Sequence, residues 1–161
     1  MEIIKEKTCC FFGHRKIKDT KELRECLIFE IERLIEKENV DTFLFGSKSE
    51  FDKLCLLLVS EIKQKYPHIK RVYVRAEYPY IDESYTAYLL ESYEHTYYPE
   101  RILNAGRAVY VERNREMIDK SAFSIVFFDD SYLPSKSKVS GTKLAYDYAI
   151  SKKNKMINVF C

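Results

Sequence analysis

The sequence lacks the signatures of several protein classes. No apolar run approaches the length that spans a membrane, and the opening seven residues are charged in character, so we expect a cytoplasmic protein without a membrane span or signal peptide. Neither a G-x-G-x-x-G nor a Walker motif occurs, which disfavours dinucleotide-dependent reduction and P-loop phosphoryl transfer. Tryptophan is absent, and the net charge is only +2, which disfavours general nucleic-acid binding.

Cysteine and histidine are too few and too scattered to indicate a metal site. The five cysteines include no Cys-x-x-Cys pair, and His14, His68 and His95 lack the spacing of metal ligands. We therefore predict reduced, packed cysteines, no metal and no cofactor.

Apolar runs of strand length alternate with helical patterns along the chain. The run Thr-Cys-Cys-Phe-Phe-Gly at 8–13 is typical of a strand buried on both faces. Strands that alternate with helices imply parallel crossovers, so we predict one three-layer α/β/α domain over residues 1–161 with a mainly parallel sheet. The expected strands are 8–13, 41–46, 70–76, 96–98, 122–128 and a buried last strand at 155–160. The expected helices are 19–39, 50–66, 84–93, 107–120 and one that starts near residue 140.

Two helix starts carry capping signals. Asp19 is followed three residues later by Glu22, which predicts a capping box for the first helix. Ser49 and Asp52 have the same spacing, so Ser49 is the predicted cap of the second helix.

Three short turns are predicted to meet at one rim of the sheet. Each follows a strand or opens a helix, and open α/β sheets bind ligands beyond the carboxyl ends of their strands. Helix N-termini attract phosphate, and small residues let the backbone approach it, so these turns predict an anionic, phosphorylated ligand. The candidate ligand-binding residues in the turns are Gly13, His14, Arg15, Gly46, Ser47, Lys48, Ser140, Gly141 and Thr142.

Asn114 is a further candidate in the predicted helix 107–120. It falls on an apolar stripe, where a buried amide needs a partner, either backbone at the sheet edge or a ligand. Arg113 and Arg115 flank the stripe, and we expect one or both to be solvated rather than to reach a phosphate.

The segment 77–99 contains seven of the 13 tyrosines. One interpretation is an aromatic wall or lid for a base or sugar. The others are a layer packed over the sheet and a surface for a second copy of the chain, because tyrosine suits any half-buried surface.

Four blocks of the chain form a recognisable set. They are Phe-Phe-Gly-His-Arg (11–15), Phe-Leu-Phe-Gly-Ser-Lys-Ser-Glu-Phe-Asp (43–52), Glu-Arg-Asn-Arg-Glu-Met-Ile-Asp-Lys-Ser (112–121) and Ser-Gly-Thr-Lys-Leu-Ala-Tyr-Asp-Tyr-Ala (140–149). Together they resemble the YpsA-like branch of the SLOG superfamily, which also holds the DprA-type and lysine-decarboxylase-like (LOG) Rossmann proteins. The resemblance implies a modified Rossmann fold that binds a nucleotide or nucleotide-derived ligand, such as an ADP-ribose-like molecule, as a sensor or regulator.

The chain departs from the catalytic members of that superfamily at Ala145. LOG enzymes carry Pro-Gly-Gly-x-Gly-Thr-x-x-Glu, whose glutamate serves N-glycosidic cleavage, and nucleoside deoxyribosyltransferases have a similar acid; Ala145 stands in that place. Glu112, Glu116 or Asp147 could serve instead, but the sequence singles out none of them. An N-glycosidase or nucleoside ribosyltransferase and a protein-interaction domain without a ligand are therefore the two alternative functions.

Overall fold

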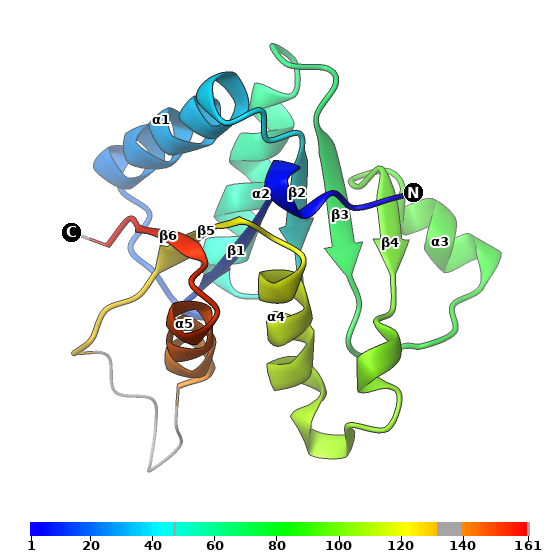
Figure 1. Cartoon of the computed structure of the whole chain (residues 1–161). Coiled ribbons are helices and arrows are strands. Elements are labelled where there is room, and N and C mark those ends of the chain that lie inside the picture. The colour runs from blue at the N-terminus through cyan, green and yellow to red at the C-terminus, as the bar shows by residue number, and fades with distance from the viewer. Residues whose placement is uncertain (47, 132–139, 161) are drawn as a thin grey trace.

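Parallel strands form the centre of the molecule. The computed structural model describes residues 1–46, 48–131 and 140–160, and in this part of the chain six strands form one all-parallel sheet in the order β4-β3-β2-β1-β5-β6 (Figure 1). The strands are β1 (Thr8–Gly13), β2 (Thr42–Phe45), β3 (Lys70–Val74), β4 (His95–Tyr97), β5 (Phe123–Phe127) and β6 (Lys155–Asn158).

Helices cover both faces of the sheet. Helices α1 and α2 pack together on one face and α4 and α5 on the other, which confirms the predicted three-layer α/β/α architecture (Figure 1). The helices are α1 (Lys21–Lys37), α2 (Glu50–Ile62), α3 (Glu83–Leu89), α4 (Val109–Asp119) and α5 (Gly141–Ser151). No helix among the described residues is long and apolar enough to cross a membrane.

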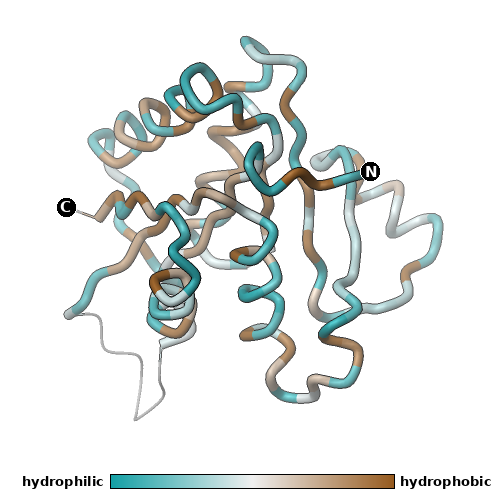
Figure 2. The backbone as a smooth tube through the Cα atoms, in the orientation of Figure 1, coloured by the Kyte–Doolittle hydropathy of each residue, from teal (hydrophilic) through white to brown (hydrophobic). Residues whose placement is uncertain are grey.

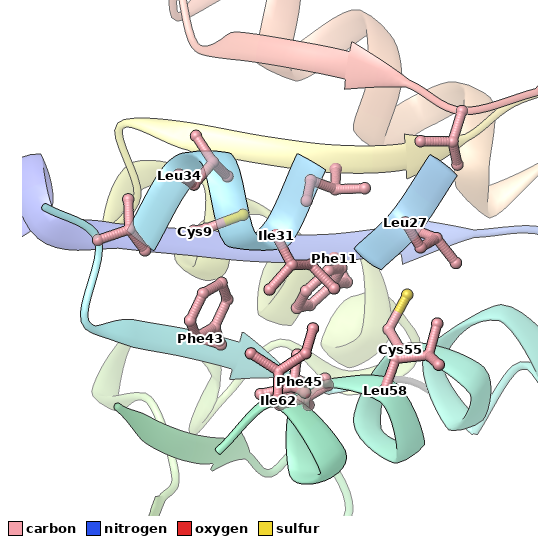
Figure 3. Close-up of a cluster of buried hydrophobic side chains, with 14 of the residues drawn as sticks. Cys9, Phe11, Leu27, Ile31, Leu34, Phe43, Phe45, Cys55, Leu58 and Ile62 are labelled. Carbon is pink, nitrogen blue, oxygen red and sulfur yellow. The ribbon is translucent and has the colours of Figure 1, made fainter. Parts of the chain in front are cut away.

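The two sides of β1 enter two separate cores. Cys9 and Phe11 face α1 and α2, and the Phe11 ring stacks on Phe45 with centroids 5.0 Å apart (Figure 3). Cys10 and Phe12 face α4 and α5. This is why the run is apolar at every position, and the central strands are correspondingly hydrophobic along their length in Figure 2. Each fully buried phenylalanine contributes about 1.5–3 kcal/mol to folding.

Local chemistry shifts some element boundaries. Thr20, not Asp19, caps α1, since its Oγ1 accepts the N–H of Leu23 at 3.1 Å. The Asp19 carboxylate instead accepts two hydrogen bonds from Arg24, each at 2.8 Å. The sequence therefore placed the helix cap one residue too early, at Asp19 instead of Thr20, because both residue types can cap a helix.

The last strand differs from its prediction in burial. β6 ends at Asn158, and its residues are exposed or half-buried. Its one paired neighbour among the described strands is β5, so β6 lies at the edge of the sheet. An apolar run near a chain end therefore does not distinguish an edge strand from a central one.

Candidate functional site

The strand order creates a topological switch point between β1 and β5. From β1 the chain passes through α1 to β2 on one face, whereas from β5 it passes to α5 and β6 on the other. The two crossovers leave neighbouring strands on opposite faces, and open α/β sheets generally bind ligands beyond the carboxyl ends of the strands at such a point. Gly13 pairs with Phe127 there, and α5 begins at this rim with Gly141. The structure thus brings the first and third predicted turns to one edge of the sheet.

His14 fastens the end of β1 to the end of β5. Its side chain is only 3% exposed, and its Nε2 accepts the backbone N–H of Asp129 at 2.8 Å. The ring lies edge-on to Phe127, with centroids 6.0 Å apart. Burial lowers the pKa of His14, which outweighs the opposing effect of Asp129. A neutral imidazole adds no positive charge, so the charge at this turn comes from the exposed Arg15.

The His14 contact predicts a dependence of stability on pH. Because the folded-state pKa lies below its ordinary value near 6.5, the contribution is complete above that pH and is lost as the pH falls through the folded-state pKa. His95, whose pKa is lowered by burial and by neighbouring positive charges, acts in the same direction. We expect His14→Gln to flatten the pH dependence of the free energy of unfolding in urea between about pH 5 and 7. His95→Asn tests the second histidine in the same way and should also flatten this pH dependence. A slope in His14→Gln equal to that of wild type would contradict the assignment.

The end of β2 is held from both faces of the sheet. The N–H of Gly46 donates to Asp52 Oδ2 at 3.1 Å, and its carbonyl accepts a hydrogen bond from Arg113 Nη1. Asp52 belongs to α2 and Arg113 to α4, so the two helices reach the same residue from opposite sides. Ser49 Oγ accepts the N–H of Asp52 at 3.0 Å, which confirms the predicted cap of α2.

Arg113 corrects a prediction made from the sequence. It is 4% exposed rather than solvated, and its Nε donates to Asn114 Oδ1 at 3.1 Å. Asn114 itself is half-buried, not on the inner stripe. Burial lowers the pKa of Arg113, and the nearby Asp52 carboxylate opposes that shift. Arg115 is half-buried and pairs with Glu112 at 2.9 Å.

The glycines of the three turns have different reasons for lacking a side chain. A Cβ at Gly13 would lie 2.4 Å from Phe51 Cδ2, and a Cβ at Gly46 would lie 2.6 Å from Arg113 Cδ. Their space is taken by side chains of the protein itself. A Cβ at Gly141 would have no neighbour within 4 Å among the described residues, so within that part of the chain this glycine, unlike Gly13 and Gly46, has space beside it.

A second polar cluster lies at the ends of β2 and β3. Lys48 Nζ is 3.3 Å from Glu77 Oε2, and the hydroxyl of Tyr110 donates to Glu77 Oε1 at 3.2 Å. The guanidinium carbon of Arg113 lies 5.8 Å from the centroid of the Tyr110 ring. The sequence predicted Lys48 as a site residue but not Glu77 or Tyr110, which reach it from distant parts of the chain. Ser47, another predicted residue, lies outside the described residues.

The position that carries the acid in LOG enzymes is part of the core here. Ala145 is buried with Cys10, Phe12 and Val126 between α5 and the sheet. Thr142, one turn earlier on the same face of α5, is also buried, and Ser140 caps the helix by accepting the N–H of Lys143.

The three acids named as alternatives all form ion pairs. Their basic partners are Arg115 for Glu112 at 2.9 Å, Arg101 for Glu116 at 3.7 Å and Lys143 for Asp147 at 3.3 Å. This arrangement selects none of them as a catalytic group.

The fold is that of a Rossmann-like α/β protein, with a topological switch point between β1 and β5. No family model matches the chain, and no curated protein matches it. Among the described residues, no group of three or more histidine, cysteine, aspartate or glutamate side chains is placed to hold a metal ion.

Proposed function

We propose that the chain binds a nucleotide or nucleotide-derived anion beyond the carboxyl ends of β1 and β5, as a SLOG protein of the YpsA-like branch. The observation that carries this proposal is the switch point itself, where ligands of open α/β sheets bind. Arg15 adds an exposed cation beside it.

The start of α5 supplies the phosphate contact in this proposal. Its first backbone N–H groups and its positive dipole end favour an anion. The open space at Gly141 lets a phosphate approach the backbone. Ser140 orders the turn as the helix cap.

Binding without catalysis is favoured over N-glycosidic cleavage. Cleavage develops positive charge at the sugar C1, which needs a carboxylate close by. The methyl group of Ala145 provides none and is buried in the core. We therefore propose a sensor or regulator that acts in the cytoplasm.

Arg15→Ala tests the phosphate contact. We expect AMP and ADP-ribose to raise the melting temperature of the wild type, since a ligand at 100 times its Kd adds about 2.7 kcal/mol. The variant should lose most of this shift, while its melting temperature without ligand stays near that of wild type, because Arg15 is exposed.

Lys16→Ala is the matched control, since Lys16 is also exposed and carries the same charge on the same loop. Equal ligand shifts in wild type and Arg15→Ala would remove Arg15 from the site. Release of adenine from AMP above the blank would instead support the glycosidase alternative.

A further inference from the structure

We propose that the ends of β2 and β3 form a second subsite, lined by Glu77, Tyr78 and Tyr110, that binds the nucleobase and ribose of the ligand. This inference rests on the proposed function, because it extends the same rim from the phosphate end of the ligand to its base. It names what the ligand must contain: an aromatic base and hydrogen-bond donors.

The polar part of the subsite is the Glu77 carboxylate. One oxygen is paired with Lys48 at 3.3 Å and the other accepts from the hydroxyl of Tyr110 at 3.2 Å. These two contacts orient the carboxylate, and each oxygen keeps a further lone pair for a ribose hydroxyl or a base amine. Its negative charge repels phosphate, so it favours only one orientation of a nucleotide along the rim.

The aromatic part of the subsite consists of Tyr78 and Tyr110, whose side chains are exposed at the surface. Tyr110 and Tyr78 are 50% and 53% exposed, and Tyr78 packs edge-to-face on Tyr85 with centroids 6.2 Å apart. Bases stack on such rings with little dependence on sequence. The guanidinium of Arg113 near the Tyr110 ring supports that ring from the protein side.

Tyr73 and Tyr93 pack over the sheet instead of lining the subsite. Tyr93 stacks on Tyr73 with centroids 5.2 Å apart and also contacts Phe45, so this pair is a layer over the sheet. Burial raises the pKa of Tyr73, and the charges of Arg113, Lys48 and Glu77 also act on it. The Tyr73–Tyr93 pair is therefore a packed pair that does not line the subsite.

The spacing of the strands fits one ligand across both subsites. β1 and β3 are separated by β2, which is two strand spacings or about 9.6 Å. A mononucleotide in an extended conformation has a comparable length. In this pose the phosphate lies beyond β1, beside Arg15 and the start of α5, and the base lies beyond β3, beside Glu77 and Tyr110.

The hollow between α1 and α2 fits a base less well. Its volume is about 320 Å³, and no aromatic ring lines it. Its two carboxylates are already engaged, Asp19 by Arg24 and Glu50 by the N–H of Ile17 at 3.1 Å. The lining residues are Ile17, Asp19, Arg24, Glu50, Lys53, Leu54 and Leu57.

Calorimetric titration of the whole chain with AMP, ribose 5-phosphate and adenosine tests the subsite. Wild type should bind AMP at least about tenfold more tightly than ribose 5-phosphate, because only AMP carries the base. Tyr110→Leu should remove that difference and leave ribose 5-phosphate binding unchanged. Tyr110→Phe keeps the ring and should keep most of the difference, and Glu77→Gln should weaken adenosine and AMP together.

Tyr66→Leu is the matched control, since Tyr66 follows α2 at the opposite edge of the sheet and bonds Glu32. Equal affinities of wild type for AMP and ribose 5-phosphate, or unchanged AMP binding by Tyr110→Leu, would overturn the subsite but leave the phosphate site standing. If the chain binds adenosine but neither AMP nor ribose 5-phosphate, the result would support the subsite and overturn the proposed phosphate site. Failure of wild type to bind AMP or adenosine would overturn the subsite. The same conclusion would follow if Tyr110→Leu changed only the oligomeric state and not the affinity for AMP, because Tyr110 would then belong to an interface between two copies of the chain.

Discussion

Arg113→Ala should lower the free energy of unfolding by about 2–5 kcal/mol, because it removes a buried hydrogen bond from a charged donor together with packed side-chain volume. The substitution leaves the Gly46 carbonyl without its donor and removes the positive charge that acts on the buried Asp52. It also opens a cavity beside Met117, which contacts the same space. Urea unfolding followed by circular dichroism measures the loss.

Two further variants separate charge from packing at this position. Asp52→Asn keeps an acceptor for the Gly46 N–H but removes the buried negative charge, so it should recover part of the loss in the Arg113→Ala background. Arg107→Ala removes an exposed arginine just before α4 and should change stability by less than about 0.5 kcal/mol. Additive effects of Asp52→Asn and Arg113→Ala would show that the two side chains are not coupled through Gly46.

Gly13→Ala should destabilise the fold by about 1–3 kcal/mol through overpacking. The new methyl would lie 2.4 Å from Cδ2 and 3.0 Å from Cβ of Phe51, a fully buried ring that contacts Phe127. Because the Phe51 Cβ is close as well as the ring, a change of rotamer alone does not relieve the contact. The loss appears as a lower urea midpoint with an unchanged slope.

The clash explanation has its own controls. Phe51→Leu in the Gly13→Ala background should cost less than the sum of the two single substitutions, because the smaller side chain gives the methyl room. Gly141→Ala should leave stability equal or slightly higher, since a Cβ there meets no described residue within 4 Å and alanine favours helix. Full additivity at Gly13 and Phe51 would assign the effect of Gly13→Ala to the backbone instead.

Much of the fold was predictable because it depends on local patterns. The apolar run 8–13 is buried on both faces, and Ser49 caps α2 as its spacing with Asp52 indicated. Parallel crossovers follow from strands that alternate with helices, and the sheet is parallel throughout the described residues. The start of α1 was one residue out because Asp19 and its neighbour Thr20 are both residue types that cap helices.

The candidate site was predictable only in part. The turns that end β1 and open α5 lie on one rim, as expected from a parallel sheet. The pattern could not show that His14 is buried against Phe127 or that Arg113 reaches the Gly46 carbonyl. The spacing of apolar residues predicts that a long charged side chain such as that of Arg113 is solvated. Its charged end can nevertheless be buried when it donates to a backbone carbonyl of a distant strand.

The class of fold follows from the period of the apolar residues, because that period sets which segments are strands and which are helices. The strand order, and with it the switch point between β1 and β5, became known from the folded structure alone. It also decided that Glu77 meets Lys48 and Tyr110, residues 29 and 33 positions away. Such contacts depend on how helices pack across the sheet, and no local pattern encodes a pairing between segments so distant in the chain.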